Sequence, residues 1–488
     1  MKKSIRFFVH LITRLLPLLL AISLLTGCDF FKFDSAKTEA QTEAQTEAQQ
    51  VQLLNGVPLA EYVIIYEERS SGYPFRAAKH IQIEIQERTG LLLPIKTDYA
   101  PENNLHEIIV GETNRRISKD LNAKTENMQF AITADESSIA MEGDYFIIAA
   151  AAYFFVETYI TGESFDSTVP QEVSIHEPIV KEAKNYIILI GDGMGFNQTH
   201  LFEKYTDGTA TTKLYSDHEN IFYGYYFPNQ GSARTDSLTG VTDSAAGATA
   251  LATGYKTNNS YVGQDKNGQN LQSLTELANS MKMATAVMST DAATGATPAG
   301  FSAHASDRDD SETIQAYQET LTKNHHTIIN CGLNYYDTVG VGQIEKELVQ
   351  TLAKLEENEN GFFMMYEEGH IDKHSHSNDM EKTFNALVRF NQVIARVMEH
   401  AFYNPDTFVI ITADHETGGL QRTGYGKFSY TKTSHSGADV PVFAYGMNAE
   451  LFDNRTIENT QISKTIAHMM GVTDFGNNDE FTSLLKLK

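Results

Sequence analysis

Three continuous apolar runs, each followed within two residues by an acidic side chain, constrain the fold of this chain most strongly. They span residues 185–190, 362–366 and 408–412. Runs of this kind are typical of strands covered on both faces, as in a parallel sheet. Helical patterns lie between them, for example over residues 380–400. Strands that alternate with helices predict an α/β fold with a doubly wound, mostly parallel sheet sandwiched by helices.

Acidic and histidine side chains gather at the expected carboxyl ends of these strands, where open α/β sheets bind their ligands. Mixed carboxylate and imidazole ligands favour zinc, and all-oxygen sets favour magnesium. Asp372 and His376 are four residues apart, so one helical turn could present both to one ion. Asp414 and His415 are adjacent, so a turn must aim them together. The candidate ligands are Asp192, Glu367, Asp372, His376, Asp414, His415 and, before a later apolar run, His435.

Each of these pieces alone is an ordinary polar loop after a strand. Glu367 and Glu368 together could be a plain acidic turn. Several such clusters in one domain need a further explanation, because carboxylates gathered at one sheet edge repel one another unless cations are bound. The pattern therefore predicts a metal centre.

Ser244 is a candidate nucleophile beside this centre. It follows Asp243 and precedes the small residues 245–250, which places it at or near a helix start. The unpaired N–H groups of a helix start favour a nearby anion. Alone, this segment is an ordinary buried helix start, and no Gly-x-Ser-x-Gly elbow indicates an esterase. A serine hydroxyl needs a base or a metal to become a good nucleophile, and the candidate metal ligands could supply that activation.

The first residues are typical of an export signal, with a short basic segment before an apolar run at 7–25. The run ends in Leu25-Thr26-Gly27-Cys28, which resembles the lipobox of bacterial lipoproteins. That resemblance implies a lipid on Cys28 and anchoring of an exported protein to a bacterial membrane, at the cell surface or on the periplasmic side. A single membrane span is the alternative, but Arg14 and Pro17 interrupt the run.

By pattern, the chain divides into four segments. We predict a signal peptide at 1–27, a polar tether with Thr-Glu-Ala-Gln repeats at 28–52, an ancillary α/β domain at 53–180 and a larger α/β domain at 181–488. In the ancillary domain we expect strands at 62–66, 91–95, 107–110 and 130–133, and helices at 77–88 and 146–160. It resembles the α/β domain ahead of the catalytic domain in some exported glycosidases, and we predict an interaction or scaffolding role.

The charge and cysteine content exclude some classes of partner and bond. The net charge of −25 argues against a nucleic-acid partner bound through a basic surface. Only Cys28 and Cys331 are present, so a lipid on Cys28 would leave no intramolecular disulfide. We expect Cys331 to be a small buried hydrophobe.

Six motifs stand out between about residues 184 and 475. They are Gly191-Asp-Gly-Met-Gly195, Thr242-Asp-Ser-Ala-Ala-Gly-Ala-Thr-Ala250, Ala296-Thr-Pro-Ala-Gly-Phe-Ser-Ala-His304, the segment 367–376, Thr412-Ala-Asp-His-Glu-Thr-Gly-Gly419 and His435-Ser-Gly437. In these motifs and in their order, this part of the chain resembles the alkaline phosphatase family. The resemblance implies that the larger domain is a catalytic domain.

The resemblance implies a role for each candidate residue. One zinc would be held by Asp372, His376 and His435. The second zinc, with Ser244 as nucleophile beside it, would be held by Asp192, Asp414 and His415. A third ion, usually magnesium, would be held by Asp192, Thr297 and Glu367. Arg308 falls at the position of the arginine that clamps the phosphate.

Two positions depart from or qualify the family pattern. Gly295, two residues before Thr297, stands where well-known members carry an Asp or His that supports the third metal. What supports that metal in this chain is therefore open. Lys373, just after Asp372, is a position where some members also carry a lysine.

The resemblance implies hydrolysis of small phosphate monoesters through a phosphoserine intermediate, and it allows a homodimer. Two further readings stay open. A phosphodiesterase or sulfatase could use the same metals, although Ser244 lacks the C/S-x-P-x-R setting of a sulfatase. A surface lipoprotein could also keep the metal site for binding without catalysis.

Overall fold

The computed structural model describes residues 51–68, 72–102, 106–121, 126–205, 221–333 and 342–476. The predicted signal peptide, Cys28 and all but the last two residues of the predicted tether lie outside these ranges. Within the described ranges, no helix has the length and apolar character that crossing a membrane requires.

The C-terminal part is built on an eight-stranded sheet. Its strands, in spatial order, are β13 (Ile328–Asn330), β12 (Ala284–Ser289), β14 (Phe362–Glu368), β10 (Asn185–Gly191), β15 (Thr407–Thr412), β20 (Val440–Tyr445), β11 (Asn229–Arg234) and β21 (Thr456–Glu458). All neighbouring pairs are parallel except the two that β20 makes. This confirms the predicted mostly parallel sheet.

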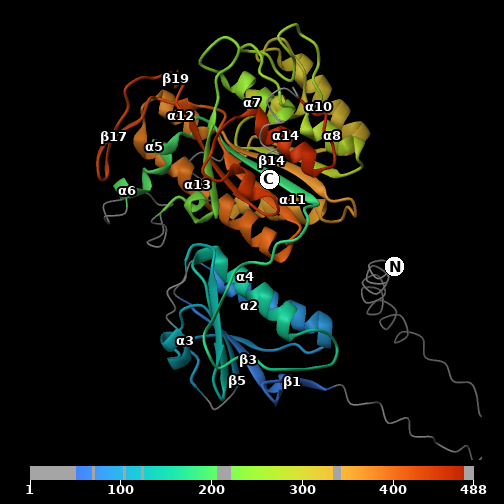
Figure 1. Ribbon diagram of the computed structural model, residues 1–488, viewed down its shortest axis with the longest axis vertical. Helices are drawn as coiled ribbons and strands as arrows, with labels where there is room; N and C mark the ends of the chain where they lie inside the picture. The colour runs from blue at the N-terminus through green and yellow to red at the C-terminus, as the bar shows by residue number, and fades with distance from the viewer. Residues whose placement is uncertain are drawn as a thin grey trace, which may run out of the picture. The chain divides into compact units, whose positions relative to one another are not determined.

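The three apolar runs of the sequence form the central strands β14, β10 and β15, and every residue of these strands is buried. Two layers of helices cover the sheet. One layer contains α7 (Ser244–Thr253), α8 (Leu274–Ser280), α9 (Ala296–Ser302) and α14 (Thr460–Met469), with α10 (Ser311–His325) packed on α9. The other contains α11 (Gly342–Leu355), α12 (His370–His376) and α13 (Met380–Tyr403). Figure 1 shows α7, α8 and α14 on one side of β14, and α11 and α13 on the other.

The N-terminal part is a smaller mixed α/β structure, as predicted. Its six-stranded sheet has the order β4 (Ile95–Thr97), β3 (Tyr62–Tyr66), β5 (His106–Val110), β7 (Ser138–Glu142), β6 (Phe130–Ala134) and β9 (Ser174–His176). The helices α2 (Tyr73–Thr89) and α4 (Ile148–Tyr159) pack together over one face, and α3 (Arg116–Leu121) covers a small separate apolar cluster. The boundary placed at residue 180 stays a prediction.

One predicted strand of this part is wrong over most of its length. Residues 91–94 carry no strand, and the ladder begins only at Ile95. Pro94 has no N–H to donate, and its carbonyl accepts a single hydrogen bond from Ile64 N at 2.9 Å. The small three-stranded sheet of β1 (Gln52–Leu54), β2 (Val57–Pro58) and β8 (Phe165–Ser167) was not predicted.

Short elements complete the described part of the chain, and two of them, β16 and β19, contribute to the site below. They are η1 (Leu59–Glu61), η2 (Tyr145–Ile147), α5 (Phe196–Thr199), α6 (Phe202–Tyr205), η3 (Tyr223–Tyr226), β16 (Glu416–Thr417), β17 (Gln421–Gly424), β18 (Lys427–Ser429), β19 (His435–Ser436) and η4 (Ala449–Phe452).

Candidate active site

The topology of the sheet brings the predicted carboxylates together. β14 and β15 both pair in parallel with β10, and Ile190 of β10 lies opposite Glu367 on one side and Thr412 on the other. Asp192 lies two residues after Ile190, and Asp414 lies two residues after Thr412. Glu367, Asp192 and Asp414 are all buried at this edge. Burial raises the pKa of Asp192 well above its ordinary value, and the nearby carboxylates raise it further.

His415 points one imidazole nitrogen at two of these acids. Its Nε2 lies 3.2 Å from Asp414 Oδ2, 3.6 Å from Asp192 Oδ1 and 3.2 Å from Ser244 Oγ. Its Nδ1 lies 3.2 Å from the Thr417 hydroxyl, which donates its own hydrogen to an aspartate. Thr417 must therefore accept from Nδ1–H, which leaves a lone pair on Nε2. Burial lowers the pKa of His415 to about 3, so the ring is neutral.

This arrangement fits a bound cation. Neither Asp192 Oδ1 nor Asp414 Oδ2 accepts a hydrogen bond, although both atoms are buried. A lone pair of His415 and two carboxylate oxygens thus converge on one small region. Buried oxygens of this kind are costly unless a donor or a cation compensates them. Mixed nitrogen and oxygen ligands suit zinc.

A second set of three ligands lies beside the first. His376 Nδ1 donates to the carbonyl of Thr433 at 2.6 Å, and His435 Nδ1 donates to the carbonyl of Thr242 at 2.9 Å. Because a carbonyl only accepts, the neutral form of each histidine carries its lone pair on Nε2. These two Nε2 atoms are 3.0 Å apart, and Asp372 Oδ1 lies 3.3 and 3.6 Å from them. Two such lone pairs repel each other at this distance unless a proton or a metal cation lies between them, and the three atoms are placed as ligands of one cation would be.

The two sets share one centre. The rings of His415 and His435 stack with centroids 3.7 Å apart, and ligand atoms of Asp372 lie within reach of both sets. Local structure explains the convergence. Asp372 and His376 are one turn apart on α12, as predicted, and the antiparallel pairing of β16 with β19 places His435 opposite Thr417. The geometry therefore suits two neighbouring divalent cations.

The third predicted set adjoins this centre. Glu367 accepts a hydrogen bond from the Ser289 hydroxyl at the end of β12. Burial, followed by the charge of Asp291, raises the pKa of Glu367 to about 8. The buried hydroxyl of Thr297, on α9, lies beside this carboxylate without a hydrogen bond of good geometry. These oxygen atoms are the kind of ligand that magnesium prefers.

Glu368 belongs to a different environment. It accepts hydrogen bonds from Arg389 Nη2 at 3.0 Å and from the Thr290 hydroxyl at 3.2 Å. Burial alone would raise its pKa, but Arg389 and then His370 hold it at about 2. Successive strand residues face opposite sides of the sheet, so Glu367 faces the metal centre and Glu368 does not.

Ser244 begins α7 and is buried. Asp243 caps this helix by accepting from Ala246 N at 3.0 Å, and its other carboxylate oxygen accepts from Arg308 Nη1 at 3.2 Å. The guanidinium is thus held beside Ser244, with about a third of its side chain exposed. Sequence reasoning missed this role of Asp243, although its place before Ser244 at a helix start is a signal for a capping residue.

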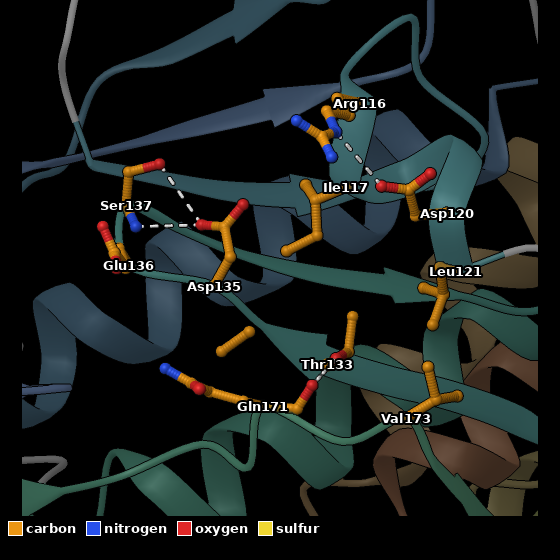
Figure 2. Close-up of a pocket in the computed structure, with 11 residues that line it drawn as sticks. Arg116, Ile117, Asp120, Leu121, Thr133, Asp135, Glu136, Ser137, Gln171 and Val173 are labelled. Atoms are coloured by element: carbon orange, nitrogen blue, oxygen red, sulfur yellow. Dashed lines mark hydrogen bonds and ion pairs between the residues drawn. The ribbon is translucent and has the colours of Figure 1, made fainter.

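A pocket of about 490 Å³ lies apart from this centre, in the N-terminal part. Figure 2 shows that α3 and the turn between β6 and β7 line it. Its Arg116 and Asp120 pair with each other at 3.4 Å and are largely exposed. Its lining residues include neither a histidine nor a converging set of buried donors, so it offers no catalytic arrangement.

Comparisons with known proteins agree with this geometry. The sequence model of the alkaline phosphatase family matches residues 183–342 and 343–430. Alkaline phosphatase 3 of Bacillus subtilis is 28% identical over 289 residues, which are 49% of this chain and 62% of that protein. Alkaline phosphatase of Escherichia coli is 33% identical over 175 residues, 36% of this chain and 34% of that protein.

A solved structure shows the same fold. The cold-active alkaline phosphatase of a psychrophilic Shewanella species aligns with a TM-score of 0.52 at 23% identity, over 59% of this chain and 99% of that chain. The matched region spans less than two thirds of the length of the Bacillus relative.

Proposed function

This chain belongs to the alkaline phosphatase family, and from that premise we propose that it hydrolyses phosphate monoesters with Ser244 as the nucleophile. One observation carries the proposal most directly. The Ser244 hydroxyl lies 3.2 Å from His415 Nε2, at the edge of two three-ligand sets, with Arg308 tied to the residue before it.

The donor sets divide into three proposed sites. Two zinc ions would be held by Asp192, Asp414 and His415, and by Asp372, His376 and His435. A magnesium ion would be held by Asp192, Thr297 and Glu367. Bound divalent cations at such sites lower the pKa of a neighbouring hydroxyl and offset the charge of phosphate oxygens.

The chain's own groups account for the rest of the reaction. Ser244 Oγ gives its proton to solvent and forms a bond to phosphorus, while the bond from phosphorus to the alcohol oxygen breaks and the alcohol takes up a proton from solvent. Water then gives a proton to solvent and forms a new bond to phosphorus, the bond to Ser244 Oγ breaks, the serine takes up a proton, and phosphate leaves. The planar guanidinium of Arg308 matches two non-bridging phosphate oxygens. The first N–H groups of α7 add positive potential beside them.

A comparison of two nitrophenyl esters tests this proposal. We expect the zinc-loaded protein, supplied with magnesium, to hydrolyse p-nitrophenyl phosphate with a higher kcat/KM than bis(p-nitrophenyl) phosphate. A monoester offers the free oxygens that Arg308 can bind, and a diester offers fewer. A clear preference for the diester would favour the phosphodiesterase alternative, and a folded, zinc-loaded protein that hydrolyses neither would favour a binding protein.

We further propose that the enzyme is exported and held at a bacterial membrane by lipid on Cys28. The basic segment, the apolar run and Leu25-Thr26-Gly27-Cys28 support this part of the proposal from sequence alone. Mass spectrometry of the N-terminal peptide should find a lipidated Cys28 and no residues before it. The Cys28→Ser variant should lack the lipid. An unmodified Cys28 in the mature protein would contradict the anchoring. A homodimer remains a prediction.

A further inference from the structure

Neighbouring atoms leave no room for a side chain at position 295, whereas the backbone angles there do not require glycine. Gly295 caps the N-terminus of α9 with φ −58°, a value that any residue can adopt. An ideal Cβ built there would lie 3.0 Å from Asp291 Oδ2 and 2.9 Å from the carbonyl oxygen of Ala292. The carboxylate of Asp291 thus occupies the space in which a side chain at 295 would begin.

Local hydrogen bonds fix this carboxylate. Asp291 lies two residues after the end of β12, and its backbone N–H donates to the Ser289 hydroxyl at 2.7 Å. Its Oδ1 accepts from Ala292 N at 2.8 Å and from Lys373 Nζ at 2.6 Å. With Oδ1 engaged twice, Oδ2 is the oxygen that faces Gly295.

The same carboxylate lies next to Glu367. The Ser289 hydroxyl that accepts from Asp291 N donates to Glu367 Oε2, so one serine links the two acids. Gly369 lies between them, since its ideal Cβ would be 3.2 Å from Asp291 Cβ and 3.6 Å from Glu367 Oε1. Asp291 and Glu367 therefore lie on either side of Gly369, close enough for the charge of Asp291 to act on Glu367, and the Thr297 hydroxyl lies beside Glu367.

We propose that Asp291 supplies the acidic ligand of the third metal site that residue 295 cannot supply. This proposal rests on the proposed function above. Asp291 Oδ2, directly or through a metal-bound water, joins Glu367 and Thr297 at the ion, and Oδ1 continues to hold Lys373. Magnesium suits the site because it takes oxygen ligands and keeps several of its waters.

Calorimetric titration of the zinc-loaded protein with magnesium chloride tests the proposal without relying on activity. The Asp291→Ala variant should bind magnesium at least roughly tenfold more weakly, the usual scale for loss of a supporting group at a metal site. Its zinc content should match the parent. Asp166→Ala, an equal change at an exposed residue of β8, is the control and should bind magnesium as the parent does. Unchanged magnesium affinity in Asp291→Ala would overturn the proposal.

A conservative substitution separates a metal ligand from a merely structural residue. Asp291→Asn keeps the size of the side chain and an oxygen that can accept from Ala292 N, but it removes the carboxylate charge. If Asp291 is a ligand, Asp291→Asn should bind magnesium more weakly than the parent, as Asp291→Ala does. Parent-like magnesium affinity in Asp291→Asn would indicate that Asp291 acts only through the shape of its loop, which would overturn the proposal.

A third variant tests the alternative that Asp291 only neutralises Lys373. Lys373→Met should still bind magnesium if Asp291 is a ligand. If Lys373→Met loses magnesium as Asp291→Ala does, the ion pair and not the ligand is essential, and the proposal fails. The proposed function fails on different grounds, namely absence of monoester turnover by the parent loaded with zinc and magnesium.

Discussion

Hydrogen-bond partners fix the tautomer of each imidazole in the centre. The Nδ1 atoms of His376 and His435 face backbone carbonyls, and that of His415 faces a hydroxyl whose hydrogen is already used. All three Nε2 atoms are thereby left as acceptors that point toward carboxylates. Groups outside the ligand set commonly orient metal-binding histidines in this way.

Removing the nucleophile should separate chemistry from metal binding. We expect Ser244→Ala to lower kcat by roughly a thousandfold or more, because no other described group takes its place at the start of α7. Acid quenching of a reaction with 32P-labelled monoester should trap phosphate on the parent but not on the variant. Zinc content should be equal in both, since the hydroxyl is not one of the two clustered ligand sets. Trapped phosphate on the variant would reject Ser244 as nucleophile.

Residues that act through contacts between distant segments could not be predicted from the sequence. The candidate ligands were visible because most of them follow an apolar run and His435 precedes one, and the structure brings them together. Asp291 follows a run as well, but its importance depends on Gly295, Lys373 and Glu367, which come from three other elements. The link of Asp243 to Arg308 is equally non-local. No periodic pattern in a single sequence records such contacts.

Helices and strands with a strong local pattern of apolar residues were predicted correctly, and those with a weak pattern were missed. The fully buried strands β10, β14 and β15 and the long amphipathic helix α13 were predicted to within a few residues. The helix predicted at 380–400 extends to Tyr403. β7 was missed because its sequence, Ser-Ile-Ala-Met-Glu, is short and mixes small and polar residues, so its burial comes from neighbouring strands.

An ion pair between elements should make stability depend on pH. His304 Nε2 lies 2.9 Å from Glu276 Oε1 on α8, and Nδ1 donates to the carbonyl of Gly263 at 2.7 Å. Burial opposes the charge on His304, but Glu276 raises its pKa above the ordinary value. The contribution of the charged His304 to the free energy of unfolding is fully present below the pKa of unfolded histidine, about 6.5. It is lost as the pH rises through the higher pKa that His304 has in the folded protein.

Glu276→Gln tests this dependence. Glutamine can keep the capping box with Ser273, so the substitution removes mainly the charge. Burial raises the pKa of Glu276, but His304 lowers it by more, so the pKa lies below its ordinary value. The contribution of ionised Glu276 to the free energy of unfolding is therefore present above the pKa of unfolded glutamate, about 4.3, and is lost at more acid pH. Urea unfolding should show a larger loss of stability in the variant at pH 6 than at pH 9. An equal loss of stability at pH 6 and at pH 9 would contradict an ion pair between His304 and Glu276.

At the scale of the whole molecule, the N-terminal elements are joined to the C-terminal end of α13. Arg76 on α2 donates to Glu399 through Nε at 3.0 Å and Nη2 at 2.7 Å. His80 stacks on Tyr403 with ring centroids 3.8 Å apart. The sequence predicted both α/β parts but not this contact, because the pairing joins residues more than 300 positions apart. These contacts suggest a supporting role for the N-terminal part.

Glu399→Gln should weaken the whole molecule without altering catalysis. Glu399 is buried and also pairs with Arg396, so its neutralisation removes the carboxylate from Arg76 and leaves Arg396 with Glu345 at 3.9 Å. We expect the free energy of unfolding to fall by about 2 kcal/mol, below the usual loss for a broken buried pair because Arg76 is 30% exposed. Position 399 lies about 28 Å along α13 from its start next to α12, so kcat should not change. Urea unfolding and monoester turnover would measure both effects, with exposed Glu359→Gln as control. Reduced kcat at unchanged stability would place Glu399 in the function of the site and not in the support of the fold.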